Sequence, residues 1–139
     1  MPIKILLVDD RPPMLYKYAD LLSSVNDKEG QPLYRILVAE DGLEALQLFK
    51  HYNIGFDLVV SGIKLPKMDG VELLKRVIKL KPELTVILHS RHAGEELNAE
   101  VCKQGAFAAF THPVEDRYFL GLVKRAVNEA SRNSILRKQ

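Results

Sequence analysis

The sequence predicts a doubly wound α/β domain, with a five-stranded parallel sheet covered by five helices. Three observations lead to this fold class. Five short apolar runs recur along the 139 residues, a segment with helical spacing of apolar residues follows each run, and the runs are continuously apolar rather than alternating. Continuous apolar strands are typical of parallel sheets buried on both faces by helices. The connections between such strands are right-handed.

The strands are predicted from the length of the apolar runs and from their β-branched content. Turn-forming or polar residues bound each run and mark its two ends. The predicted strands are Ile3–Val8, Tyr34–Ala39, Phe56–Val60, Leu84–Leu88 and Ala106–Phe110.

The helices are predicted from apolar residues that recur three and four positions apart. A fourth helix is expected over Ala93–Lys103, ending at Gly105, because glycine suits the left-handed conformation that follows a helix. A fifth helix begins near Glu115, after Pro113. The first three helices carry Leu15, Tyr18, Ala19 and Leu22, then Leu43, Ala45, Leu46 and Phe49, then Val71, Leu74, Val77 and Ile78.

The α/β domain is expected to span residues 1–128. Residues 129–139 turn polar and basic. Two interpretations of them stay open: a helix extension or linker into an output region, or a frayed end. The polar residues 26–32 predict a surface loop.

The composition predicts one cytoplasmic domain. Twenty Lys and Arg against 18 Asp and Glu leave a net charge of +2, without the concentrated basic patch of most nucleic-acid-binding proteins. No apolar run approaches the roughly 20 residues that span a membrane, and no signal-peptide pattern opens the chain. The single cysteine, Cys102, excludes an internal disulfide and is expected to be a small buried side chain on the fourth helix.

The candidate functional residues follow the strands, because ligands bind at the carboxyl ends of the strands in doubly wound sheets. The chain lacks the usual phosphate-loop, dinucleotide, zinc-protease, redox and hydrolase motifs. The residues at this edge are Asp9, Asp10, Glu40, Asp41, Ser61, Gly62, Ser90, Arg91, Thr111 and His112.

Four segments at this edge resemble the receiver domain of two-component response regulators. They are the pair Asp9 and Asp10, SGIKLPKMDG at 61–70, HSRHA at 89–93 and FTHP at 110–113, and the resemblance covers residues 3 to about 128. It implies a flavodoxin-like, receiver-type fold and a role in phosphorelay signalling. In that family the acidic pair helps to hold a divalent cation and an aspartate ending the third strand accepts phosphate. A Ser or Thr follows the fourth strand, and a Lys precedes a proline after the fifth.

The sequence keeps part of this pattern. The resemblance assigns Asp9 and Asp10 to the acidic pair, which makes them the metal ligands if a metal binds. It assigns Ser90 to the hydroxyl switch position. It assigns Pro113 to the proline, which in this family often follows a cis peptide bond.

Three other positions depart from the family. The phosphoacceptor position falls on Gly62, which has no side chain to attack phosphate or bind a metal. The lysine position falls on His112, and the position of the switch aromatic falls on Ala109. The sequence therefore predicts an atypical pseudo-receiver that is not phosphorylated at the usual position and binds Mg²⁺ weakly.

The neighbouring residues do not replace the lost acceptor. Successive strand side chains point to opposite faces, so the Ser61 hydroxyl should point away from the acidic pair. Asp57 lies about 16 Å away along the strand, at about 3.3 Å per residue. Asp69 fits a turn residue before Gly70.

Two interpretations of the pocket chemistry stay open. In one, a side-chain cation replaces the metal beside the acidic pair, supplied by Arg11, Arg91 or a protonated His112. In the other, His92 and His112 join Asp9 and Asp10 in a transition-metal site. His51, by contrast, is expected to be only an exposed or packing residue.

The expected function is that of a regulatory protein-interaction module, without enzymatic activity. The resemblance implies a surface built from the fourth helix, fifth strand and fifth helix, and either a signalling partner, a tethered output domain or a second copy to bind it. An enzyme pairing Ser90 with His92 or His112 lacks a visible oxyanion motif. Nucleic-acid binding through the basic tail is also disfavoured.

Overall fold

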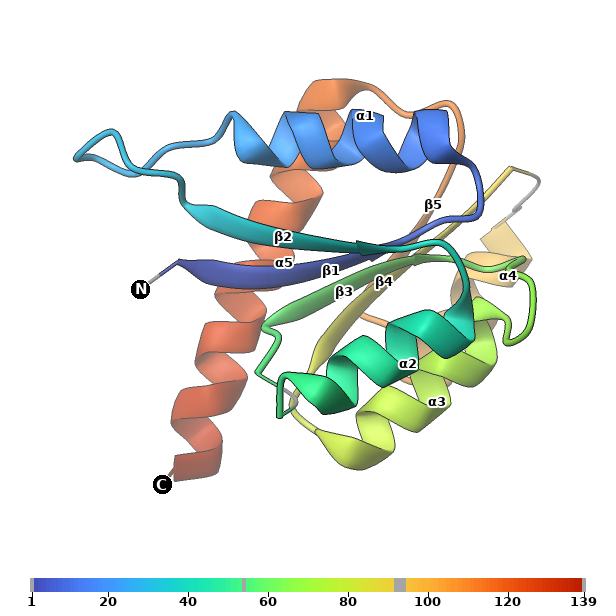
Figure 1. Cartoon of the computed structure of the whole chain (residues 1–139). Helices are drawn as coiled ribbons and strands as arrows, with labels where there is room; N and C mark the ends of the chain where they lie inside the picture. Colours follow the sequence, from blue (N-terminus) through green and yellow to red (C-terminus); the bar gives the residue numbers. More distant parts are fainter. Residues whose placement is uncertain (1, 54, 92–94, 139) are drawn as a thin grey trace.

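The computed structural model describes residues 2–53, 55–91 and 95–138. Strands and helices alternate along the chain, and the strands form one parallel sheet in the order β2-β1-β3-β4-β5 (Figure 1). This confirms the predicted doubly wound fold. The elements are β1 (Ile3–Val8), α1 (Pro12–Ser23), β2 (Tyr34–Ala39), α2 (Gly42–His51), β3 (Leu58–Gly62), α3 (Gly70–Leu80), β4 (Thr85–Ser90), α4 (Glu95–Lys103), β5 (Ala108–Thr111) and α5 (Asp116–Lys138).

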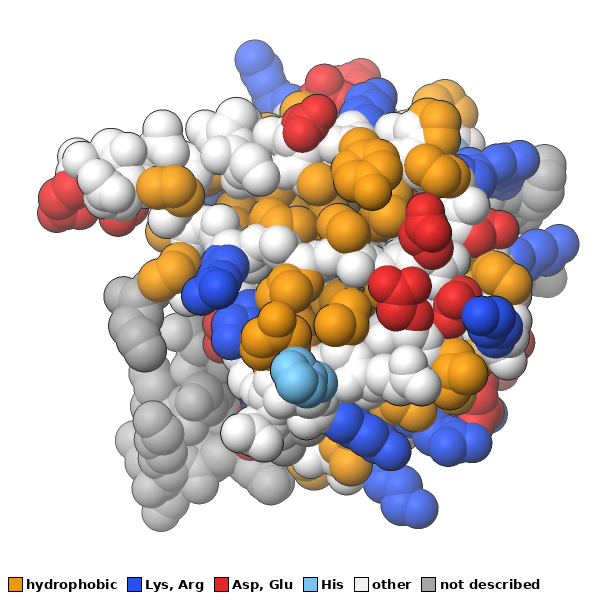
Figure 2. Space-filling view, viewed as in Figure 1, with side chains coloured by type: hydrophobic (Ala, Val, Ile, Leu, Met, Phe, Trp, Pro, Cys, Tyr) orange, Lys and Arg blue, Asp and Glu red, His pale blue; other side chains and the backbone are white. Residues whose placement is uncertain are grey.

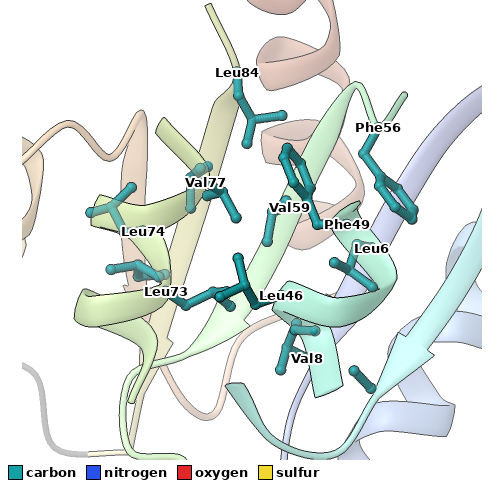
Figure 3. Packing of buried hydrophobic residues seen from close by; sticks show 14 of the residues in the cluster. Leu6, Val8, Leu46, Phe49, Phe56, Val59, Leu73, Leu74, Val77 and Leu84 are labelled. Atoms are coloured by element: carbon teal, nitrogen blue, oxygen red, sulfur yellow. The ribbon is translucent and has the colours of Figure 1, made fainter. Parts of the chain in front are cut away.

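The sheet is buried on both faces, and alternate residues of each strand serve one face or the other. Leu6 and Val59 face α2 and α3, where they belong to the same cluster as Phe49 and Leu74 (Figure 3). The intervening residues, such as Val60, face α1 and α5. This two-sided burial explains why the strands are continuously apolar.

The last three strands begin and end later than predicted. Parallel pairing carries them further, since Gly62 lies opposite His89 and Ser90 lies opposite Thr111. At the other end, β5 begins after Ala106 because the Ala106 N–H donates to the Val101 carbonyl and completes the turn that ends α4. Gly105 in this turn has a φ of +116°, as its predicted role requires. Gly62 and His89 are therefore strand residues.

The loop from β3 to α3 depends on a glycine that the sequence places in its MDG turn. A Cβ on Gly70 would collide with the carbonyl of Gly62, so no other residue fits without movement of the backbone. The Gly70 N–H also donates to the Ile63 carbonyl at 2.7 Å. This contact fixes the carboxyl end of β3.

Helix α5 runs without a break from Asp116 to Lys138, so the segment proposed as an extension continues the same helix. Helix α4 begins at Glu95, and the predicted start at Ala93 lies outside the described residues. Loop 26–32 is closed by an isolated bridge between Asn26 and Pro32.

The prediction that Cys102 is buried is wrong, because its side chain is exposed. Val101 is the residue of α4 that packs into the core at this turn. Cys102 follows it by one position, which rotates its side chain away from the core. His51 is exposed, as expected. None of the described helices combines the length and hydrophobicity of a membrane span.

Candidate functional site

The carboxyl ends of β1, β3, β4 and β5 meet at one edge of the sheet, where Figure 2 shows acidic and basic side chains gathered. A hollow of about 270 Å³ lies there. The residues that line it are Asp9, Asp10, Arg11, Gly62, Ile63, Lys64, His89, Ser90 and Arg91. Five of the ten predicted edge residues are therefore brought together around this hollow: Asp9, Asp10, Gly62, Ser90 and Arg91.

Asp9 is buried at this edge, with 2% of its surface exposed, and it is paired with Arg11. The Arg11 backbone N–H donates to Asp9 Oδ1 at 2.9 Å, and Nε donates to the same oxygen at 3.1 Å. Nη2 donates to Oδ2 at 3.1 Å. A two-pronged guanidinium contact of this kind is strong and fixes orientation. Of the three predicted cations, Arg11 is the one that contacts the acidic pair, through Asp9.

The other two candidates for that cation do not fill the role. Arg91 is exposed on the rim of the hollow. The prediction of a protonated His112 is wrong, because burial lowers the pKa of His112 and the Arg11 charge lowers it further. Asp10 is exposed, so the two residues of the acidic pair occupy different environments.

Gly62 ends β3 inside the hollow, opposite His89. A Cβ built on it would lie 3.4 Å from Leu65 Cδ2 and 3.5 Å from His89 Cε1, which are ordinary contacts. Its backbone is not in the left-handed region. Glycine is therefore not required here by the fold.

A chain of aromatic and imidazole groups links the hollow to α1. The Tyr18 hydroxyl lies 2.7 Å from His112 Nδ1, and His112 Nε2 lies 2.9 Å from His89 Nδ1. His89 Nε2 in turn lies 3.9 Å from Asp9 Oδ2. We call these four residues together with Arg11 the imidazole chain.

Burial keeps His89 neutral by lowering its pKa from 6.5 to about 3, so its approach to Asp9 is a polar contact rather than an ion pair. A carboxylate only accepts hydrogen bonds, which favours a proton on His89 Nε2. His112 Nε2–H then donates to His89 Nδ1, and the Tyr18 O–H donates to His112 Nδ1. Burial and the Asp9 charge raise the pKa of Tyr18 to about 12, so it keeps its proton.

The sequence did not single out His89 as a site residue. The apolar run predicts that the fourth strand ends at Leu88, whereas β4 extends to Ser90 and carries His89 into the buried edge. The predicted partner of His112 in a metal site was His92, which lies outside the described residues. In the observed strand His89 lies two residues after Ile87, so strand alternation places both side chains on the same face of the sheet.

The remaining candidates lie as follows. Ser90 ends β4 and lines the hollow, and Ala109 is half-buried in β5. The His112–Pro113 peptide bond is cis, as the resemblance implied. The Ser61 hydroxyl donates to the Gly62 carbonyl and does not line the hollow.

The two other carboxylates considered as substitutes have structural roles. Asp57 accepts a hydrogen bond from the Lys4 N–H near the start of β1. Asp69 is the N-cap of α3 and accepts from the Glu72 N–H at 2.8 Å.

The residues present do not fit the Mg²⁺ that the family implies. Mg²⁺ is held through oxygen ligands in octahedral geometry. Gly62 offers no side-chain oxygen, and Arg11 already neutralises Asp9. Among the described residues that line the hollow, Asp10 alone keeps an exposed carboxylate.

Comparison with known proteins identifies the family. The family model of the response regulator receiver domain matches residues 5–124. Sporulation initiation phosphotransferase F of Bacillus subtilis is 34% identical over 112 residues, which are 81% of this chain and 83% of that protein. Transcriptional regulatory protein GlrR of Escherichia coli is 32% identical over 114 residues, or 82% of this chain. The match is 24% of that regulator, so the chain spans about a quarter of its length.

A solved structure agrees with these matches. The CheY-like response regulator receiver domain protein from Methanospirillum hungatei JF-1 superimposes with a TM-score of 0.80 at 31% identity, covering 95% of this chain and 98% of that one. The sheet order, the acidic pair and the cis proline described above lie within the matched residues. This chain belongs to the response regulator receiver domain family.

Proposed function

We propose that this receiver domain works without phosphorylation, as a regulatory module that binds other proteins in two-component signalling. The observation that carries the proposal is Gly62 at the end of β3, in the position of the family's phosphoacceptor. Transfer of a phosphoryl group needs a nucleophile at the site. Gly62 has none.

The residues around Gly62 support the same conclusion. Arg11 holds Asp9 where the family uses a divalent cation. His112, at the lysine position, has a lowered pKa and both of its ring nitrogens lie within hydrogen-bond distance of Tyr18 or His89. The groups that would bind and neutralise a phosphoryl group are therefore engaged with one another.

An interaction role needs surface that a partner can bind. Phe107, beside β5, and Tyr118, on α5, are large apolar side chains with exposed surface. Receiver domains act on partner signalling proteins or on output domains in the same chain. We assign this chain to one of those two modes and to the cytoplasm, with a second copy as an alternative partner.

Incubation with acetyl phosphate, followed by intact-mass measurement at neutral pH, tests the proposal. The unmodified chain should gain no phosphoryl group, with or without Mg²⁺. The double variant Gly62→Asp, His112→Lys restores the family's acceptor and lysine, and it serves as the matched control. A phosphoryl adduct on the unmodified chain would contradict the proposal, and peptide mapping would locate the acceptor.

The geometry does not favour an esterase or phosphatase. A serine nucleophile needs a base whose nitrogen can accept its proton. His112 Nδ1 lies 2.7 Å from the Tyr18 hydroxyl and Nε2 lies 2.9 Å from His89, so neither nitrogen is available to Ser90.

A further inference from the structure

We infer that Asp9, His89 and His112 form a binding site for a divalent transition-metal ion such as Zn²⁺. Each residue offers one ligand atom, and the three atoms lie within 4.8 Å of one another. The residues come from the position directly after β1, from β4 and from the position directly after β5. This inference goes beyond the regulatory role, and it holds or fails independently of phosphorylation.

The spacing suits a small metal ion. Two ligands bound tetrahedrally to Zn²⁺ at about 2.0–2.1 Å lie roughly 3.3–3.4 Å apart. His89 can give the metal only one ring nitrogen: Nδ1 lies 2.9 Å from His112 Nε2, whereas Nε2 lies 3.9 Å from Asp9 Oδ2. With one ligand atom taken from each residue, the three atoms lie within 4.8 Å of one another, so the side chains must shift to bring every pair to the separation that the metal needs.

The ligand types select the metal. Imidazole nitrogens with one carboxylate suit Zn²⁺, Co²⁺ or Ni²⁺, whereas Mg²⁺ requires oxygen ligands. Compared with the family's pattern, this edge lacks the carboxylate at Gly62 and has an imidazole at His112. Its ligands therefore favour ions such as Zn²⁺ over Mg²⁺.

Asp9 can bind a metal while it remains paired with Arg11. Its Oδ1 atom accepts from two Arg11 groups, but Oδ2 accepts only from Nη2. A carboxylate oxygen accepts two hydrogen bonds, so Oδ2 keeps one lone pair on the side of His89. The nearby Arg11 charge repels the metal and limits its affinity.

Tyr18 supplies the outer contact that metal-bound histidines usually have. When His112 binds the metal through Nε2, the ring carries its proton on Nδ1. This N–H then donates a hydrogen bond to the Tyr18 oxygen at the present 2.7 Å spacing, and the Tyr18 O–H turns away from the ring. Ring stacking between Tyr18 and His112 holds the imidazole plane in place.

The ligands are reachable from solvent on two sides. Asp9 and His89 line the hollow that contains Gly62. His112 lines a neighbouring hollow with Tyr18 and Pro113. Arg11 and Arg91 border both, so the ligand cluster lies between two openings.

Titration of the full chain with Co²⁺, followed by visible absorption, tests the site directly. Tetrahedral nitrogen and oxygen ligation should give d–d bands that Zn²⁺ abolishes and Mg²⁺ leaves unchanged. His112→Gln, which changes a half-buried residue, should weaken binding more than tenfold, and His89→Gln should do the same. Tyr18→Phe should weaken it about tenfold.

Two further variants make the test specific. His51→Gln removes an exposed histidine elsewhere and should leave the titration unchanged. Arg11→Gln removes the competing charge and should tighten binding. Circular dichroism of each variant establishes that it is folded. The absence of Co²⁺ bands, or bands that persist in folded His112→Gln, would overturn the assignment whatever the phosphorylation assay shows.

Discussion

Gly62 is the residue on which the proposed lack of phosphorylation depends, yet the backbone around it would accept a side chain. A methyl group there would make contacts of 3.4 Å or longer. Glycine within a strand costs roughly 0.5–1 kcal/mol relative to alanine, because the unfolded glycine is more flexible.

Gly62→Ala is therefore expected to raise the free energy of unfolding by about 0.4–1 kcal/mol. Urea denaturation at pH 7 measures the change. Gly70→Ala is the matched control, since a Cβ there collides with the Gly62 carbonyl and should destabilise the domain. A loss of stability in Gly62→Ala would show that glycine is required by the fold.

Arg11 compensates a buried negative charge. Arg11→Gln should lower the free energy of unfolding by about 1–3 kcal/mol at pH 7, because Asp9 is left buried with a weaker partner. Arg11 keeps 23% of its side chain exposed, which places the value below that of a fully buried pair. Thermal and urea unfolding of Arg11→Gln and of the conservative Arg11→Lys measure the effect. Equal stability of all three proteins would contradict the role given to the pair.

The sequence reveals the identity of the edge residues better than their environment. Asp9, Arg11 and Gly62 were placed correctly because each lies next to a strand end that periodicity locates. His89 was missed and Cys102 misjudged, because each depends on a strand end or helix rotation that shifts by one or two residues. The ion pair, the neutral histidines and the hydrogen bonds between them depend on distances that no local pattern contains.

At the scale of elements, Asp69 of the MDG turn begins helix α3 as its N-cap. The Asp69 side chain accepts from the Glu72 N–H at 2.8 Å and begins the helix that follows Gly70. A capping side chain satisfies one of the unpaired N–H groups of the first turn.

Asp69→Ala should lower the free energy of unfolding by about 1 kcal/mol, whereas Asp69→Asn should retain most of the stability. Equilibrium denaturation of the two variants makes the comparison. If Asp69→Asn were as unstable as Asp69→Ala, the cap would not explain the loss. Asp41, which caps α2 through the Glu44 N–H, offers an independent repeat of the same measurement.

Most elements were predictable because each local pattern agrees with the global fold. The first two strands have the predicted bounds, since turn residues lie on both sides of them. The bounds of β3, β4 and β5 differ because parallel partners extend the pairing past the apolar run. Residues such as Ser61 and Gly62 enter the sheet through their neighbours rather than through their own propensity.

At the scale of the whole molecule, the buried histidine links stability to pH. The pKa of His89 is about 3 in the folded protein, compared with 6.5 for an unperturbed histidine. Between these values the unfolded chain binds a proton that the folded protein does not, so stability falls as the pH decreases. Above pH 6.5 the histidine is neutral in both the folded and the unfolded protein, so it causes no loss of stability there.

Metal-free protein should therefore lose about 2–3 kcal/mol of stability between pH 7 and pH 4.5 through this residue, before most carboxylates titrate. Urea denaturation across that range, with a chelator present, measures the slope. His89→Gln should flatten it, and His51→Gln should not. A slope unchanged in His89→Gln would contradict the assignment of a buried neutral imidazole.

The imidazole chain closes on itself, because its two ends belong to one segment: Arg11 directly precedes α1, and Tyr18 lies within it. The ring runs from α1 through the ends of β1 and β4 to the residue after β5, and back to α1. A partner that displaces α1 must therefore disturb the contact at Asp9 and the contact at His112 together. These contacts join α1 to the residue after β5 without a phosphoryl group.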